Sequence, residues 1–199
     1  GSILNILTDE FPNARAFSTT HWREILNQIQ NVALHKSRLK IPVLYGIDAI
    51  HGATYTEGGT LFPQSISMAA SRNPDLVRKA AQVTADEVKA SGILWNFNPV
   101  LDVARQPLWS RVFETFGEDT FLVTKMGTAY IEGHKGVGTT LKHYVGYSYP
   151  WSGKDRTPAQ MSERVLRETF LPPFAAGVKA GAPSVMINSG SIDSVPGHI

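Results

Sequence analysis

The chain has 199 residues, 42% hydrophobic and 18% charged, a balance that excludes an intrinsically disordered protein. Its 19 basic and 17 acidic side chains give a net charge of +2 without any basic run, which argues against nucleic acids and membrane surfaces as partners. Without cysteine it forms no disulfide or thiolate metal site, and no apolar stretch reaches the roughly 18 residues of a membrane span. A small neutral ligand fits this composition best.

Five short β-rich apolar segments recur along the chain and are separated by helical patterns. The predicted strands are residues 2–7, 42–48, 93–99, 139–146 and 184–189. This alternation predicts parallel strands joined by helical crossovers, as in an α/β barrel or an open doubly wound sheet.

The first helical pattern follows three candidate N-cap residues at positions 18 to 20. Apolar residues then recur at helical spacing, which predicts a helix with one apolar face packed on the outside of a barrel. They are Trp22, Ile25, Leu26, Ile29 and Ala33.

The second predicted strand leads directly into Asp48, which His51 follows three residues later. A carboxylate and an imidazole thereby leave a buried strand at its C-terminal end, where α/β barrels keep their chemistry. An aspartate that only caps or turns a loop is normally flanked by polar residues instead. We therefore interpret Asp48 as a residue that grips substrate.

The second helix is predicted to begin after the N-cap Asn73 and to end at Gly92. Its inward face is predicted to consist of Val77, Ala80, Ala81, Thr84 and Val88. Beyond the third strand, a long loop carries Arg105, Trp109 and Arg111. Arginine offers fixed donors to sugar hydroxyls or carboxylates, and tryptophan offers an apolar face to the C–H side of a pyranose. The alternative for each arginine is an internal Arg–Glu pair that holds the loop.

A third helix is predicted from about 119 to 133, and the strand after it carries Lys142 and His143 near its end. Successive strand residues face opposite sides of a sheet, so both side chains enter one pocket only if the backbone departs from a regular strand. We predict a β-bulge or a cis peptide bond at this point. A structural role is the alternative for an isolated histidine.

The fourth helix is predicted to start at Ser162, to break or kink at residues 172–173 and to end at Gly181. The fifth strand then brings Met186 and Asn188 to the height of the pocket, whereas Asp193 is more typical of a turn. The six histidines lack metal-site spacing within one element, and no Gly-rich loop opens a helix to bind phosphate. We therefore expect no metal and no cofactor.

An eight-stranded α/β barrel takes about 250 residues, so this chain holds about five of its eight strand–helix units. We predict that residues 1–199 form a single domain, part of a (β/α)8 TIM barrel, with the doubly wound sheet as the alternative. Neither chain end resembles a natural domain boundary. We therefore expect the domain to need the remainder of its own polypeptide.

Several spaced motifs resemble the N-terminal barrel of family 3 glycoside hydrolases, the family of bacterial and plant β-glucosidases and exo-glucanases. The motifs occur in the family's order and cover nearly the whole chain, at residues 46–52, 62–64, 69–70, 102–105, 109–111, 116–119, 142–144 and 195–198. The resemblance implies that four residues hold hydroxyls of the terminal sugar in the −1 subsite, and these match the residues chosen above. They are Asp48, Arg111, Lys142 and His143, with Arg105, Trp109, Met186 and Asn188 as weaker candidates for substrate contact.

The family hydrolyses with retention, which requires a carboxylate nucleophile and a second carboxyl group that serves as acid and then as base. The resemblance implies a nucleophilic aspartate soon after Ile199 and an acid/base in a separate C-terminal domain. Glu114, Glu118 and Asp155 are typical of helix caps or loop partners instead. We expect no catalytic residue in this chain, which alone should bind sugar without hydrolysing it.

One branch of the family, the β-N-acetylglucosaminidases, carries a histidine acid/base after a Lys-His-Phe-Pro-Gly-His-Gly motif. This chain has Lys-His-Tyr-Val-Gly-Tyr-Ser at residues 142–148, which favours the glucosidase-like branch. The implied reaction is retaining hydrolysis of terminal β-glucosidic bonds from the non-reducing end of β-glucosides or oligosaccharides. Polysaccharide degradation of this kind implies a secreted or periplasmic protein.

Three alternatives to this function stay open on the sequence. The first is a catalytically silent carbohydrate-binding relative, and the second is a related exo-hydrolase such as a β-xylosidase. The third is an unrelated metabolic barrel, which would have no affinity for sugar. The sequence does not indicate an oligomeric state.

Overall fold

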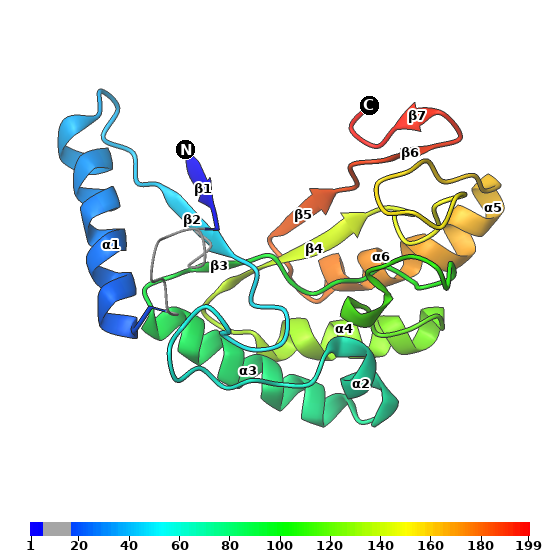
Figure 1. Ribbon diagram of the computed structural model, residues 1–199, viewed down its shortest axis with the longest axis horizontal. Helices are drawn as coiled ribbons and strands as arrows, with labels where there is room; N and C mark the ends of the chain where they lie inside the picture. Colours follow the sequence, from blue (N-terminus) through cyan, green and yellow to red (C-terminus); the bar gives the residue numbers. More distant parts are fainter. Residues whose placement is uncertain (6–16) are drawn as a thin grey trace.

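The computed structural model describes residues 1–5 and 17–199, which form a five-stranded parallel sheet (Figure 1). Its strands are β1 (Ser2–Leu4), β2 (Leu44–Ile47), β3 (Trp95–Asn96), β4 (Gly138–Tyr144) and β5 (Ser184–Ile187). They pair in the order β1-β2-β3-β4-β5, each parallel to the next. This order has no switch point, so the doubly wound alternative is wrong and the sheet is part of an α/β barrel.

Helices follow the strands and cover one face of the sheet, where α3, α4 and α6 lie side by side (Figure 1). The helices are α1 (Thr19–Asn31), α2 (Ser65–Ala70), α3 (Pro74–Ala90), α4 (Thr120–Gly133), α5 (Glu163–Val165) and α6 (Leu171–Lys179). Three short helical segments join them, namely the π-helical η2 (Val32–Lys36) and η4 (Leu166–Phe170) and the 3-10 helix η3 (Val112–Glu114). Among the described residues, no helix is long and apolar enough to cross a membrane.

Side-chain caps confirm the predicted helix starts. The hydroxyl of Ser18 accepts a hydrogen bond from the backbone N–H of His21, and Asn73 caps α3 with Pro74 in its first turn. Asp119 accepts from the N–H of Leu122 at 2.7 Å, and the fourth helical region begins after Ser162. Each cap satisfies N–H groups that lack a partner inside the helix, which is why these starts are visible in the sequence.

The predicted apolar faces of α1 and α3 lie toward the sheet. Trp22 and Leu26 of α1 are buried together with Tyr45 and Ile47 of β2 in one core cluster. The residues predicted to face inward from α3 are all buried, namely Val77, Ala80, Ala81, Thr84 and Val88. Burial of these faces holds the helical layer against the sheet.

The structure corrects several predicted boundaries. All five strands end before the predicted residue, β2 and β3 also begin later than predicted, and β4 begins one residue earlier. Residues 6 and 7 of the first predicted strand lie outside the described residues. The fourth helix changes to π geometry at η4 and continues as α6, whose first turn contains residues 172–173. Proline is tolerated there because first-turn N–H groups need no intrahelical partner. Two elements were not predicted, namely α2 and the hairpin of β6 (Ser191–Ile192) and β7 (Val195–Pro196).

The face of the sheet opposite the helices carries a cleft of about 250 Å³. Leu4, Trp95, Phe97, Thr140 and Met186 contribute to its lining. The indole N–H of Trp95 donates to the hydroxyl of Thr140 at 2.7 Å, which ties β3 to β4 across this face. In a complete barrel this face is the interior, filled by layers of side chains.

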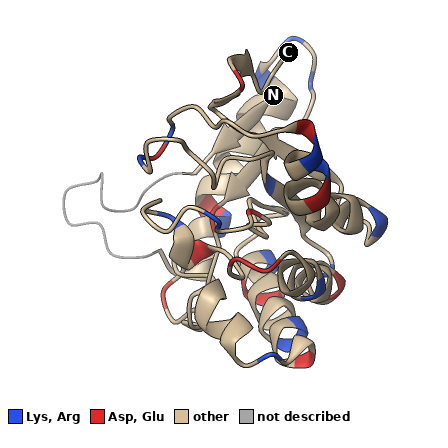
Figure 2. Ribbon diagram, turned by 90° about the vertical axis from the view of Figure 1, so that its right-hand side faces the viewer, with Lys and Arg blue, Asp and Glu red and all other residues tan. Residues whose placement is uncertain are grey.

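Basic and acidic residues are interspersed along the outer helices (Figure 2). Exposed ion pairs join Arg164 to Glu168 at 3.1 Å and Arg167 to Glu163 at 2.7 Å, each one helical turn apart. Mixed charge of this kind favours solubility without forming a single-sign surface.

Candidate functional site

The C-terminal ends of three neighbouring strands carry the candidate site. Asp48 directly follows β2, Asp102 lies in the segment after β3, and Lys142 and His143 belong to β4. The segment after β3 runs alongside β4, because the N–H of Leu101 donates to the carbonyl of Lys142 at 2.7 Å. This pairing brings Asp102 to the same edge of the sheet as the two residues of β4.

Asp48 and Lys142 form an ion pair in which Nζ lies 2.5 Å from Oδ1. The Lys142 side chain is only 3% exposed and therefore needs a partner for its charge, whereas the Asp48 side chain is 28% exposed. The amide of Asn5 donates to Oδ2 of Asp48 at 3.1 Å. Asp48 is thus oriented by two donors while part of its carboxylate remains accessible.

His143 is bound to Asp102 through both its backbone and its ring. Oδ2 of Asp102 accepts from the backbone N–H at 3.0 Å and from Nδ1 at 2.8 Å. The proton is therefore assigned to Nδ1, which leaves Nε2 to other partners. Among the described residues, Oδ1 of Asp102 is a buried acceptor without a hydrogen-bond partner.

A cis peptide bond joins Lys142 to His143, and the pairing of β4 with β5 shifts register between Leu141 and Tyr144. The predicted departure from regular strand geometry is therefore confirmed. Lys142 and His143 contact carboxylates that follow two different strands, Asp48 and Asp102. Two adjacent residues of β4 therefore both contact side chains at the C-terminal edge of the sheet.

Arg111 forms the Arg–Glu pair that was the alternative to a sugar contact. Its Nε and one Nη donate to the two carboxylate oxygens of Glu114 at 2.7 and 2.8 Å. Burial acts to lower the pKa of Arg111, but the hydrogen bonds of Glu114 outweigh it and hold the pKa above its ordinary value. The guanidinium is permanently charged, and its second Nη is not used by Glu114.

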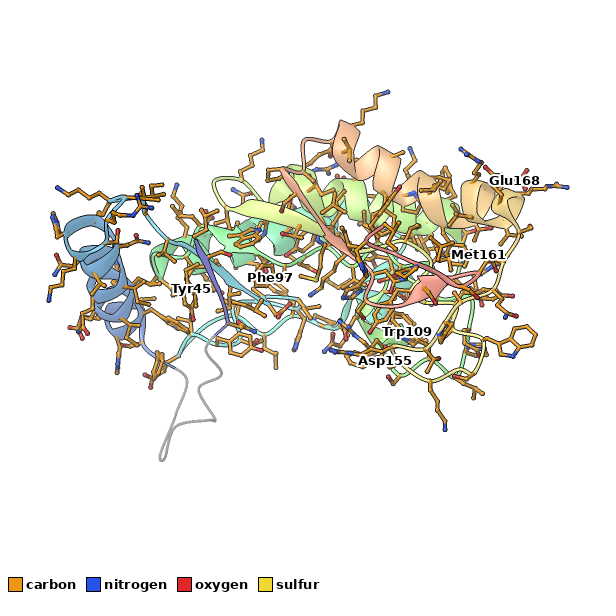
Figure 3. The ribbon with its side chains drawn as sticks, turned by 90° about the horizontal axis from the view of Figure 1, so that it is seen from above. Tyr45, Phe97, Trp109, Asp155, Met161 and Glu168 are labelled. Carbon is orange, nitrogen blue, oxygen red and sulfur yellow. The ribbon has the colours of Figure 1, made fainter. Side chains whose placement is uncertain are left out.

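Trp109 is only 2% exposed, and its ring packs edge-on against Tyr147. Its indole N–H donates to Oδ1 of Asp155 at 2.8 Å, and Figure 3 shows the two side chains near each other. Burial acts to raise the pKa of Asp155, but hydrogen bonds from Tyr147 and Trp109 outweigh it and lower the pKa. Burial also raises the pKa of Tyr147, which therefore keeps its hydroxyl proton.

A second polar cluster supports Asp48 from the helical side of the sheet. The amide of Asn96 accepts from the N–H of Ala49 at 2.9 Å and donates to its carbonyl at 3.2 Å. The same amide contacts the hydroxyl of Tyr130 at 3.2 Å and Nε2 of His134 at 3.3 Å. Burial lowers the pKa of His134 to about 4, so this histidine is neutral near pH 7.

The other predicted contacts lie in different settings. Arg105 is exposed, and Met186 is half-buried in the cleft of the inner sheet face. The amide of Asn188 is occupied by backbone groups, since it donates to the carbonyl of Val145 and accepts from the N–H of Gly190. Within residues 1–5 and 17–199, none of the three bonds to the Asp48–Lys142 pair.

Three residues of the site were not predicted from the sequence, namely Asp102, Asn96 and Tyr147. A usable signal existed for Asp102, because it ends the apolar run of residues 99–101 just as Asp48 ends the run before it. Asn96 and Tyr147 act through contacts with distant segments, which leave no pattern in the local sequence.

The assembled cluster presents cationic and amide donors beside partly accessible carboxylate oxygen. Such a mixture suits a ligand with many hydroxyl groups, which both donate and accept. In the part of the chain that the structure describes, no three His, Cys, Asp or Glu side chains are placed to hold a metal ion.

Comparison with known proteins shows what the chain is similar to. Residues 4–199 match the model of the "Glycosyl hydrolase family 3 N terminal domain". A lysosomal beta glucosidase of Dictyostelium discoideum is 45% identical over 89% of this chain and 23% of its own length. A periplasmic beta-glucosidase of Salmonella typhimurium is 34% identical over 91% of this chain and 24% of its own length. A beta-xylosidase of Formosa agariphila is 40% identical over 81% of this chain and 25% of its own length.

A solved structure extends the similarity to three dimensions. The exo-1,3/1,4-beta-glucanase of a Pseudoalteromonas species superposes with a TM-score of 0.91 at 30% identity, covering 100% of this chain and 26% of that protein. The chain thus spans about a quarter of the length of the proteins it matches.

Proposed function

Since the chain belongs to the glycosyl hydrolase family 3 N-terminal domains, we propose that it supplies the sugar-binding residues of a retaining exo-acting β-glucosidase. Asp48, Arg111, Lys142 and His143 would hold hydroxyls of a terminal β-glucosyl unit in the −1 subsite. Membership of this family removes the alternative of an unrelated metabolic barrel. The substrate is a small carbohydrate, as in the family.

The observation that carries this proposal is the Asp48–Lys142 pair at the edge of the sheet. Lys142 is almost fully buried, yet its partner carboxylate is 28% exposed, so the pair has one accessible end. A carboxylate accepts several hydrogen bonds at once, so Asp48 can keep its contacts with Lys142 and Asn5 while it accepts from a sugar hydroxyl. Hydrogen bonds that strengthen as the ring approaches an oxocarbenium ion would assist the rate as well as binding.

Both bond-breaking carboxyl groups are proposed to come from other residues of the polypeptide. Retention requires a nucleophile and an acid/base about 5–5.5 Å apart, one on each side of the scissile bond. Asp48 and Asp102 are each bound to a basic side chain, at 2.5 and 2.8 Å, which suits holding rather than attack. We place the nucleophile after Ile199 and the acid/base in a C-terminal domain, so the 199-residue chain alone would be inactive.

The proposed location is outside the cytosol, in the periplasm or secreted. It is supported by the similarity to a periplasmic and to a lysosomal β-glucosidase.

The experiment is to express the full-length polypeptide and measure hydrolysis of an aryl β-glucoside and an aryl β-xyloside. Asp48→Ala should lower kcat/KM by about 100-fold or more, because a buried lysine and a sugar hydroxyl both lose a charged partner. Asp86→Asn is the matched control, since Asp86 is exposed on α3 away from this cluster. Wild-type activity in Asp48→Ala would overturn the site assignment.

Two outcomes would select a different function. Faster hydrolysis of the xyloside would identify a β-xylosidase, an alternative supported by the 40% identity to a β-xylosidase. Sugar binding without hydrolysis of either substrate would identify a catalytically silent carbohydrate-binding protein.

A further inference from the structure

Tyr147 contacts two of the proposed sugar-binding residues at once. Its ring meets His143 edge-on, with centroids 4.7 Å apart and planes at 63°, and Cζ of Arg111 lies 5.7 Å from its centroid. The Tyr147 side chain is buried, with 4% of the residue exposed. Tyr147 therefore lies between Arg111, which follows β3, and His143, which belongs to β4.

The hydroxyl of Tyr147 interacts with a cation and an anion. It interacts with the guanidinium of Arg111 and with the carboxylate of Asp155, and both interactions affect the pKa of Tyr147. Asp155 is itself held by the indole N–H of Trp109 at 2.8 Å, and the ring of Trp109 meets Tyr147 edge-on at 5.3 Å. The orientation of Tyr147 is thus fixed by neighbours on both its ring and its hydroxyl.

Glu114 leaves one motion of Arg111 unconstrained. The two parallel hydrogen bonds to Glu114 fix the edge of the guanidinium that carries Nε and one Nη. The group can still swing about that edge, which would move the remaining Nη relative to a bound sugar. The ring of Tyr147 lies 5.7 Å from Cζ of Arg111 and its hydroxyl interacts with the guanidinium, so both parts of the side chain restrict this motion.

We propose that Tyr147 is a positioning residue that holds Arg111 and His143 in the orientation needed to bind sugar hydroxyls, with Asp155 as its anchor. This inference rests on the proposed sugar-binding function. The ring packs on His143 and lies beside the Arg111 guanidinium, whereas the hydroxyl interacts with Arg111 and Asp155, so removal of the hydroxyl alone separates its contribution from that of the ring. Tyr147→Phe should loosen Arg111 alone, and Tyr147→Leu should loosen both.

The test is calorimetric binding of glucose and its four monodeoxy analogues, at positions 2, 3, 4 and 6, to the full-length protein. A hydroxyl held by a charged group should make glucose bind about 10-fold or more tighter than the analogue that lacks it. Arg111→Ala identifies the hydroxyl that Arg111 holds, and His143→Ala identifies the hydroxyl of His143. Tyr147→Phe should then reduce discrimination at the Arg111 hydroxyl by about 3-fold or more and leave the others unchanged.

The controls distinguish positioning from general damage to the fold. Tyr149→Phe removes a hydroxyl from the same loop but from a ring that packs on Phe170, and it should leave the whole pattern intact. Equal weakening of all analogues in Tyr147→Phe, or no weakening at all, would overturn the positioning role. A wild-type protein that binds no glucose would instead overturn the proposed function, and this inference would fall with it.

Discussion

Two polar clusters meet at the turn that carries Asp48. The front cluster lies at the C-terminal edge of the sheet, and the rear cluster lies on its helical side. The front cluster is ionic, with Lys142 paired to Asp48 and His143 bound to Asp102. The rear cluster is neutral, because burial lowers the pKa of His134 to about 4 and raises that of Tyr130 above its ordinary value. Both clusters hold the same short segment, Asp48 by its side chain and Ala49 by its backbone.

The two clusters differ in charge because they differ in access to solvent. Removal from solvent destabilises an ionised group. The buried rear cluster accordingly consists of an amide, a phenol and a neutral imidazole. The front cluster retains charge because its carboxylates neutralise the buried cation and Asp48 is partly accessible. Ligand hydroxyls can therefore join the front cluster, whereas the rear cluster is closed and serves as support.

After Asp48→Ala, the largest expected effect on activity comes from breaking the front cluster at Asp102. Asp102→Asn should lower kcat/KM of the full-length protein for an aryl β-glucoside by about 10- to 100-fold, because an amide no longer specifies which ring nitrogen of His143 carries the proton. The measurement is steady-state kinetics together with circular dichroism. Unchanged kinetics in a folded variant would mean that the orientation of His143 does not matter.

Breaking the rear cluster should cost stability as well as activity. Asn96→Ala leaves the N–H and carbonyl of Ala49 without their side-chain partner inside a buried site, at a cost of about 3 kcal/mol in the free energy of unfolding. Urea unfolding followed by tryptophan fluorescence would measure this loss. A variant as stable as wild type would show that the rear cluster is not a support.

The pH dependence of stability should come from the rear cluster. The pKa of His134 is about 4 when folded and ordinarily about 6.5, so the unfolded chain takes up this proton first as the pH falls. Stability from this group is therefore complete above about pH 6.5 and declines toward pH 4, with about 2 kcal/mol lost by pH 5. Urea unfolding at pH 7 and pH 5 should show a smaller decline in His134→Gln, and an equal decline would contradict the assignment.

The smallest effect is expected at an exposed ion pair that belongs to neither cluster. Arg164→Ala removes a partner of Glu168 from a pair whose side chains are 80% and 63% exposed. The expected change in unfolding free energy is below about 0.5 kcal/mol, with no change in kcat/KM. A larger change would show that exposed charges on the outer helices contribute to stability or activity, as the charges of the front cluster are expected to do.

Position along a strand made much of the site predictable. Asp48 and Lys142 lie at the ends of apolar segments, and parallel strands bring their ends together, so their contact follows from local sequence. Asp102 also follows an apolar segment, so its position was open to the same prediction. The sequence identified Arg111 as a candidate site residue, but it could not show whether Arg111 pairs with Glu114 or contacts sugar.

The rest of the site depends on distances that no local pattern encodes. Asn96 reaches Ala49 from 47 positions along the chain, and Trp109 reaches Asp155 from 46. Such contacts exist only once the helical layer and the loops have packed. The fold class was predictable because strand and helix periodicity is local, but strand ends were not, since backbone pairing and not side-chain type decides them.

The sequential strand order has a consequence for synthesis. Each strand pairs with the strand made just before it, so the sheet can grow one unit at a time as the chain leaves the ribosome. The hydrogen-bonding partners of Asp48, Lys142, His143 and Arg111 described above lie between Asn5 and Tyr147. All of them have therefore been synthesised before translation reaches β5, and the pocket can assemble during translation.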